Sequence, residues 1–201
     1  MILISSTCFS LPKCNGDYKI HCYGVIFHKN GEKYVGEIKD YKYNGNGTYL
    51  FVNGNIYTGE FKDGVQKGKG VFEFSNGDKY DGEFENGLFH GYGIATFSNG
   101  NKYSGEYHYD LIHGEGIFEF SNGDKYDGGF KDGFKHGDGT LIFANGDKYV
   151  GEFNNDMYNG EGTLTMANGE EKKGFFKDNF FIKNWYIFFN NSHLFELELV
   201  Q

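Results

Sequence analysis

The sequence is dominated by an internal repeat. The stretch FEFSNGDKYDG at residues 72–82 returns unchanged at residues 118–128, which is 46 positions later, or twice 23. A fixed period of this length predicts a repeat architecture. Each unit of such an array buries its apolar face only against its neighbours, so the number of units, and not the chain length, determines the size of the core.

Tyrosine and glycine mark the period along most of the chain. Tyrosines recur every 23 residues, and each is followed two positions later by glycine: Tyr34, Tyr57, Tyr80, Tyr103, Tyr126 and Tyr149. An Asn-Gly pair ends three residues before each of them, with its glycine at Gly31, Gly54, Gly77, Gly100, Gly123 and Gly146, and the series continues at Gly169. Asn-Gly between apolar runs predicts a β-hairpin turn, because both residues tolerate a positive φ.

Alternation of side chains then selects the loop length. Phe72 and Phe74 alternate with a glutamate, and Tyr80 lies on the apolar face of the next strand. A two-residue turn would put the two aromatic faces on opposite sides of the sheet. A three-residue loop, residues 75–77, with Gly77 in the left-handed conformation of a bulge, pairs Phe72 with Tyr80. The same register predicts two ion pairs on the solvent face: Glu73–Lys79 and Glu119–Lys125.

A second turn signal follows ten residues after the first, at Asp63-Gly64, Asn86-Gly87 and Asp132-Gly133, and the other repeats lack its glycine. We therefore expect an all-β chain, an elongated antiparallel hairpin meander with one hairpin per repeat. Seven hairpins are clear, from residues 24–38 to 162–176. With a degenerate eighth, about sixteen strands would form a single curved sheet whose aromatic side chains line one face.

Three segments are expected. Residues 1–20 form an irregular N-terminal segment, residues 21–176 the repeat array, and residues 177–201 a degenerate repeat or cap. In the last segment, apolar residues alternate as in an inward-facing hairpin: Trp185, Ile187, Phe189, Phe195, Leu197 and Leu199. A sheet edge that is not covered invites pairing with another chain, so dimerisation through a terminal edge is the competing interpretation.

Charge and cysteine content bear on partners and location. The net charge of −9 comes from interleaved acidic and basic residues, which disfavours nucleic acid and purely electrostatic binding to anionic membranes. The first eleven residues make a poor signal peptide. Three cysteines, Cys8, Cys14 and Cys22, lack CxxC spacing, and their odd number predicts reduced thiols in a cytosolic protein.

The unit that begins at Tyr80 reads Tyr-x-Gly-x4-Gly-x2-His-Gly-x-Gly, with Tyr80, Gly82, Gly87, His90, Gly91 and Gly93. It resembles the MORN (membrane occupation and recognition nexus) repeat over about residues 21–176. Some units depart from the motif: Asn44, Lys67 and Asn159 replace its histidine, and Tyr41, Asp110 and Asp156 its middle glycine. The resemblance implies a non-catalytic β solenoid that acts as a scaffold in assemblies at membranes, the cytoskeleton, and cilia or flagella. In some relatives the repeats are joined to a kinase or methyltransferase domain, for which this sequence leaves little room.

Three recurring residue types suggest chemistry, and for each an interpretation without catalysis or ligand binding is favoured. Equivalent positions lie two strand spacings apart, about 9.6 Å, so they cannot share one zinc ion. This applies to the histidines His21, His90, His113 and His136. The glutamates Glu60, Glu83, Glu106 and Glu152 are expected to be solvated. The Gly-x-Gly pairs, such as those at Gly91 and Gly114, are expected to relieve backbone crowding. We therefore expect no catalytic residue, metal site or cofactor.

Aromatic side chains are the candidate binding residues. Most should pack repeat on repeat, but a single sheet cannot bury both faces, so part of the aromatic face should stay open to an extended peptide or a helix of a partner. The candidate residues are Phe72, Phe74, Tyr80, Phe84, Tyr103, Phe118, Phe120 and Tyr126. The expected function is a cytoplasmic scaffold for protein–protein interaction in a cytoskeletal, ciliary, flagellar or membrane-associated assembly. Phospholipid or membrane-surface binding is the alternative, and intrinsic enzymatic activity is disfavoured.

Overall fold

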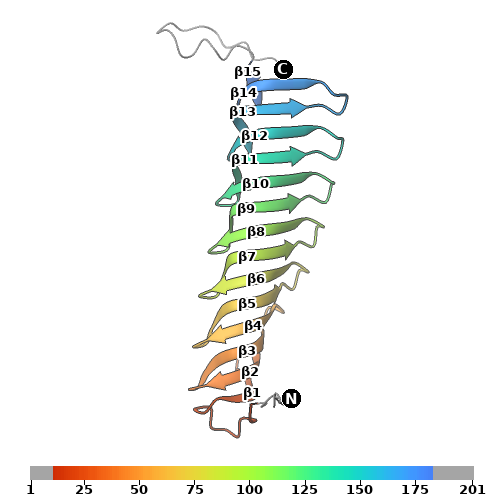
Figure 1. Ribbon diagram of the computed structural model, residues 1–201. Coiled ribbons are helices and arrows are strands. Elements are labelled where there is room, and N and C mark those ends of the chain that lie inside the picture. Colours follow the sequence, from red (N-terminus) through yellow and green to blue (C-terminus); the bar gives the residue numbers. More distant parts are fainter. Residues whose placement is uncertain (1–10, 183–201) are drawn as a thin grey trace, which may run out of the picture. The chain divides into compact units, whose positions relative to one another are not determined.

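The computed structural model describes residues 11–182, which form fifteen β-strands and no helix (Figure 1). The strands are hydrogen-bonded in sequence order, from β1 to β15, in one antiparallel sheet. This confirms the all-β hairpin meander. The predicted count of about sixteen strands differs because β15 is the last described strand; the inward-facing residues from Trp185 onward lie outside the described part.

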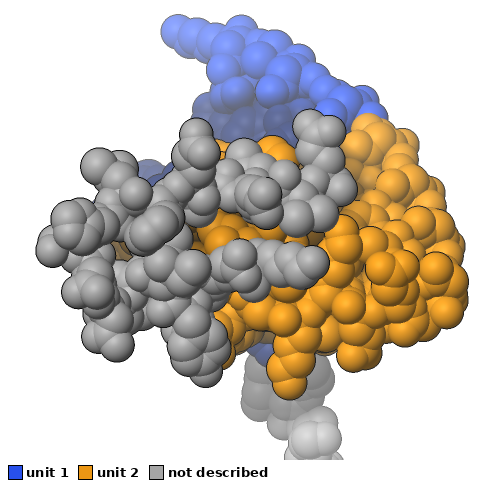
Figure 2. All heavy atoms as spheres, turned by 90° about the horizontal axis from the view of Figure 1, so that it is seen from above, with its two compact units in different colours: residues 1–88 blue, residues 89–201 orange. Residues whose placement is uncertain are grey.

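The strands belong to two compact units, residues 1–88 and 89–201 (Figure 2). The first unit contains β1 (Cys22–Phe27), β2 (Lys33–Lys39), β3 (Lys42–Leu50), β4 (Ile56–Lys62), β5 (Val65–Glu73) and β6 (Lys79–Glu85). The strand β7 (Leu88–Thr96) begins at the last residue of this unit. The second unit continues with β8 (Lys102–His108), β9 (Leu111–Glu119), β10 (Lys125–Lys131), β11 (Phe134–Ile142), β12 (Lys148–Asn154), β13 (Met157–Thr165), β14 (Glu171–Lys177) and β15 (Phe180–Ile182).

The Asn-Gly turn adopts the predicted three-residue loop. Phe74 N donates to Asp78 O at 2.8 Å, Gly77 N donates to Phe74 O at 3.0 Å, and Gly77 has a φ of 92°. Phe72 pairs with Tyr80 across the hairpin, as the alternation of side chains requires. The predicted surface pairs are present too: Lys79–Glu73 at 4.0 Å and Lys125–Glu119 at 3.9 Å.

Side chains in these loops link each repeat to the next. The Oδ1 atom of Asn55 accepts a hydrogen bond from Ser75 N at 3.0 Å, and that of Asp124 accepts one from Ala144 N at 2.8 Å. Both bonds join residues 20 positions apart, and so connect neighbouring hairpins. The loop of one repeat is therefore held by the loop of its neighbour as well as by its own strands.

The second turn is a two-residue connection in which both residues have positive φ. Asp63 and Gly64 have φ values of 52° and 93°. Where the sequence lacks the glycine, a residue with a side chain takes its place, as Tyr41 does with φ 61°. At Asp110 the side chain compensates, because its Oδ1 accepts a hydrogen bond from Phe89 N at 2.8 Å.

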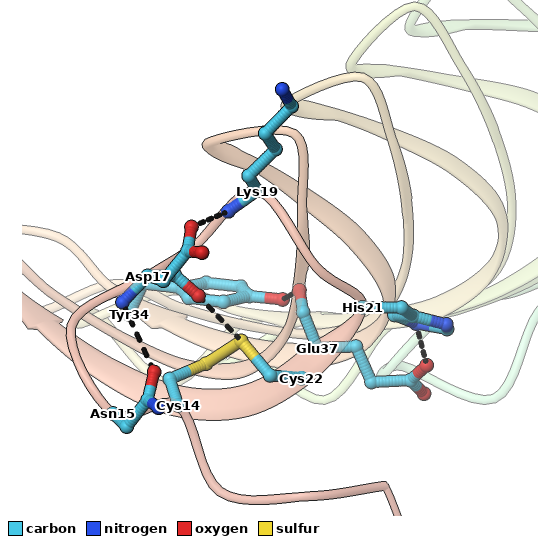
Figure 3. Close-up of a disulfide and its surroundings, with 8 residues drawn as sticks. All are labelled: Cys14, Asn15, Asp17, Lys19, His21, Cys22, Tyr34 and Glu37. Carbon is cyan, nitrogen blue, oxygen red and sulfur yellow. Dashed lines mark hydrogen bonds and ion pairs between the residues drawn. A yellow bond between two sulfur atoms is a disulfide. The ribbon is translucent and has the colours of Figure 1, made fainter.

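The segment before β1 corrects one prediction. Cys14 and Cys22 form a disulfide, with a Cα–Cα distance of 5.1 Å (Figure 3), so they are not the reduced thiols that the odd number of cysteines suggested. Two backbone hydrogen bonds bring them together: Cys14 N donates to Tyr23 O at 3.0 Å, and Tyr23 N donates to Pro12 O at 2.9 Å. Counting cysteines could not anticipate this pairing, because it depends on the N-terminal segment turning back along β1.

Candidate partner-binding surface

The anchor tyrosine of each repeat lies across a pair of glycines. Gly59 and Gly70 face each other on β4 and β5, and Tyr57 is fully buried beside them. A Cβ atom added to Gly59 would lie 2.6 Å from Tyr57 Oη, and one added to Gly70 would also lie 2.6 Å from it. The prediction that glycine relieves crowding is thus confirmed at Gly70, where the crowding group is the tyrosine ring. At Gly59 the backbone of the opposite strand crowds the added Cβ as well, with Gly70 Cα at 2.5 Å.

The tyrosine hydroxyl closes a short loop within its own strand. Tyr57 Oη donates to Glu60 O, three residues on, at 2.9 Å. The same bond recurs from Tyr34, Tyr80, Tyr103, Tyr126 and Tyr149. Burial raises the pKa of Tyr57 well above its usual value and that of Tyr149 to about 12. These phenols are therefore neutral structural donors over the physiological pH range.

A second row of rings packs edge-on against the tyrosines. Tyr57 meets Phe61 at a centroid distance of 5.0 Å and Phe84 at 4.8 Å, in T-shaped geometry. Four of the predicted binding residues belong to these two buried rows, with exposed fractions of 0–3%: Tyr80, Phe84, Tyr103 and Tyr126. They form the core, and a partner could not contact them without separating the repeats.

The other four predicted residues, Phe72, Phe74, Phe118 and Phe120, are half-buried. In the first unit, two of these residues belong to a strip of neighbouring rings whose centroids lie 4.7–5.6 Å apart: Tyr49, Phe51, Phe72 and Phe74. In the second unit a similar strip, with distances of 4.5–6.1 Å, consists of Phe97, Phe118 and Phe120. We call these the two aromatic strips. Tyr49, Phe51 and Phe97 were not among the predicted residues, although each lies 23 residues from a predicted member.

The strip of the second unit carries one cation. Lys135 Nζ lies 5.7 Å from the ring centroid of Phe120 and the same distance from that of Tyr126. It also contacts Asp156 Oδ1 at 3.0 Å. The lysine charge is therefore balanced beside the rings, and the strip itself stays apolar.

The recurring glutamates have a structural role that the sequence analysis did not predict. The β4–β5 ladder shifts between Gly59 and Phe61, and opposite this shift Gly68 takes a φ of 74°. Glu60 lies at the irregularity, where its Oε1 accepts a hydrogen bond from Lys69 N at 3.0 Å. Glu37 and Glu152 bond Asn46 N and Glu161 N in the same way. Instead of being merely solvated, these carboxylates accept hydrogen bonds from backbone N–H groups that have no carbonyl partner where the ladder shifts.

The predicted histidines lie near the second turns, in separate local contacts. His21 Nε2 lies 3.0 Å from Glu37 Oε2, and Asp132 N donates to His113 Nδ1 at 3.4 Å. The ring of His90 packs on His108, with a centroid distance of 5.4 Å. His136 Nδ1 is buried and has no hydrogen-bond partner within residues 11–182. Among the described residues, no group of three or more His, Cys, Asp or Glu side chains could hold a metal ion.

Several solved structures are similar to this chain at a low level. The TCP domain of Drosophila melanogaster SAS-4 in complex with a proline-rich motif of Ana2 is 16% identical, with 77% of this chain and 90% of that chain covered and a TM-score of 0.43. The wild-type TCP10 domain of Danio rerio CPAP is 14% identical, with 77% and 94% covered and a TM-score of 0.24.

Within residues 11–182 no helix is long and apolar enough to cross a membrane.

A search of curated proteins found no match. The family model of the MORN repeat, in contrast, matches six consecutive units: residues 34–56, 57–79, 80–102, 103–125, 126–148 and 149–171. These units cover well over half of the sequence, and each begins at one of the buried tyrosines. The chain therefore belongs to the MORN repeat family.

Proposed function

We propose that this chain is a non-catalytic scaffold that holds protein partners against its aromatic strips. The observation that supports this most directly is the combination of buried and half-buried rings at one 23-residue period. The core rows hold neighbouring repeats together, while the strips, including Phe74 and Phe120, present apolar rings that are still partly accessible to a partner.

The polar groups that recur along the array support the same proposal. The glutamate carboxylates bond backbone N–H groups, and the tyrosine hydroxyls bond backbone carbonyls. These groups are occupied in maintaining the repeat itself. A surface of half-buried aromatic rings suits an amphipathic helix or an extended peptide, whose apolar side chains would pack between the rings.

The proposed setting is a cytoplasmic assembly of the cytoskeleton, of a cilium or flagellum, or of a membrane-associated structure, as membership of the MORN repeat family suggests. Microscopy of the tagged chain tests this setting directly. Enrichment at the cell cortex, at a cilium or at a cytoskeletal structure supports it, and a uniform distribution through the cell contradicts it.

The two identical stretches allow a matched test of the strips. The variant Phe74→Ser/Phe120→Ser removes one ring from each strip. The control Glu73→Ser/Glu119→Ser changes the preceding residue in each stretch, on the opposite face of the sheet. Partners recovered by affinity purification with the unmodified chain and with the control, but lost with the strip variant, would support the proposal. Thermal melting must show that the strip variant is still folded.

Two outcomes would contradict the proposal. One is that no reproducible protein partner is recovered with the unmodified chain. The other is that the chain co-floats with phosphoinositide vesicles at physiological salt and loses this property in the strip variant, which would favour the membrane-binding alternative.

A further inference from the structure

The strand β1 is the first strand of the sheet, and β2 is its only neighbouring strand among the fifteen that the structure describes. The N-terminal segment covers the beginning of its other side through the two hydrogen bonds with Tyr23 N and O. Backbone groups point to the same side of a strand at every second residue. The N–H and C=O groups of Val25 and Phe27 therefore point outward as well, beyond the reach of the bonds that cover Tyr23.

Side chains along this edge are unusually apolar. Tyr23, Val25 and Phe27 have exposed fractions of 47%, 41% and 76%. At the equivalent positions of β9 the chain has Glu115, Ile117 and Glu119, in a strand paired on both sides. An open edge with exposed apolar side chains is what natural sheets normally avoid, because it is a template for pairing with another strand.

The covering segment, residues 11–21, is here called the strap. In addition to the peptide bond from His21 to Cys22, the Cys14–Cys22 disulfide ties the strap to the start of β1 (Figure 3). Within residues 11–182, two further backbone hydrogen bonds hold the strap in addition to those with Tyr23: Tyr41 N donates to Tyr18 O at 2.9 Å, and Asp40 N donates to Lys19 O at 3.3 Å. A disulfide stabilises such a connection mainly by limiting the conformational freedom that the segment has when it is detached.

We propose that reduction of the Cys14–Cys22 disulfide releases the strap, and that β1 then pairs antiparallel with β1 of a second copy of the chain. The apolar residues of the edge are symmetric about Val25, with an aromatic residue two positions away on either side. A two-fold axis at Val25 sets Tyr23 opposite Phe27 of the second copy, and Val25 opposite its counterpart.

This register is consistent for both the backbone and the side chains. Tyr23, Val25 and Phe27 all direct their backbone groups outward, so each facing pair is a hydrogen-bonded pair that exchanges two bonds. About six bonds across the axis replace the two that each strap makes with Tyr23. Aromatic residues face aromatic residues on the outer side of the sheet, which is a favourable cross-strand combination.

The strap determines whether this pairing is accessible. While the strap is attached, Tyr23 N and O are occupied, so Phe27 of a second copy cannot form its bonds there. In the reductive step, a dithiol reductant supplies two electrons and two protons. The S–S bond breaks, Cys14 and Cys22 become thiols, and the reductant becomes its own disulfide.

The full chain can be tested by light scattering after size exclusion, in its oxidised form and in excess dithiol. The oxidised chain should have the mass of a monomer, and the reduced chain should approach twice that mass as concentration rises. The variant Cys14→Ser/Cys22→Ser should behave as the reduced chain without reductant, with a non-reducing gel to show that no intermolecular disulfide links the copies.

A matched pair of variants identifies the surface. Val25→Lys places two like charges opposite each other on the axis and should abolish the doubling of mass. Val150→Lys makes the same change at a residue of similar exposure, 44%, in the interior strand β12, and should leave the reduced dimer intact. A reduced chain that stays monomeric would overturn the proposal. So would a dimer that forms in both redox states, or one that Val25→Lys does not affect.

Discussion

At the residue scale, the repeat depends on a fit between one tyrosine and two glycines. The Tyr57 ring occupies the space over Gly59 and Gly70 that side chains would otherwise fill, and its hydroxyl bonds a carbonyl of its own strand. The 23-residue recurrence of both residue types therefore reflects packing inside each hairpin. Two substitutions test the two parts of this fit.

Tyr57→Phe keeps the ring and removes the hydroxyl. The partly buried hydrogen bond to the Glu60 carbonyl is lost, so the free energy of unfolding should fall by about 1–2 kcal/mol. Urea denaturation measures the change. Tyr41→Phe, at a side chain that is 68% exposed, is the control and should be close to neutral. Equal effects of the two variants would show that the hydroxyl bond contributes nothing.

Gly59→Ala tests the space instead of the bond. The added Cβ would lie 2.5 Å from the Cα of Gly70 and 2.6 Å from Tyr57 Oη, so backbone or ring must move. We expect a loss of about 3 kcal/mol in the free energy of unfolding, at the upper end of the range for overpacking. Thr58→Ala, at the adjacent exposed position, should cost far less. A well-tolerated Gly59→Ala variant would contradict the packing account.

At the element scale, the two turns of each hairpin differ in how well the sequence suits them. The first turn keeps glycine in all seven loops, whereas the second position of the second turn is a residue other than glycine, also at positive φ, in several repeats. A left-handed conformation costs such residues about 1–2 kcal/mol. The departures from the family motif are thus local weaknesses of the hairpins that contain them.

Tyr41→Gly should relieve this strain and raise the free energy of unfolding by about 1 kcal/mol, since Tyr41 has a φ of 61° and an exposed side chain. The comparison is Asp110→Gly at the equivalent turn. There the gain should be smaller or absent, because the aspartate also accepts the bond from Phe89 N. Chemical denaturation of both variants measures the difference; a larger gain at position 110 would be inconsistent with this reasoning.

At the scale of the whole molecule, interactions join neighbouring repeats, as the loop bonds from Asn55 to Ser75 and from Asp124 to Ala144 illustrate. Deleting one complete repeat, residues 103–125, should therefore leave a folded β protein with a lower melting temperature. Deleting residues 103–124 removes one residue fewer and turns the side chains after the junction to the wrong face. Circular dichroism should show cooperative melting for the first variant and its loss for the second. Identical melting of both would contradict a strict register.

The buried tyrosines also predict how the chain responds to alkali. Tyr149 has a folded-state pKa of about 12, above the usual tyrosine value of 10.0, because burial disfavours the phenolate. A raised folded pKa means that the neutral phenol contributes stability in full below pH 10, and that this contribution is lost as pH rises through 12. We expect β structure and phenolate absorbance to change together in this range. Complete ionisation of the tyrosines with intact β structure would contradict the burial.

The sequence alone determined the period, the strand type and the first turn, because Asn-Gly spacing and alternation of Phe72, Phe74 and Tyr80 allow only one loop length. The irregular ladder at Glu60 could also have been predicted from the sequence. A two-residue turn at Asp63-Gly64 in an unbroken register cannot pair Tyr57 with Phe72, so the ladder between them has to shift.

Only the tertiary structure decided which aromatic residues are available to a partner. Tyr80 and Phe72 are paired on the same face of one hairpin, yet the first is buried and the second half-buried. The burial of each ring depends on which side chains of the neighbouring strands pack against it. The periodic pattern of the sequence does not carry this information. The Cys14–Cys22 disulfide likewise depends on a chain reversal outside the period, where the sequence has no repeat from which the geometry could be inferred.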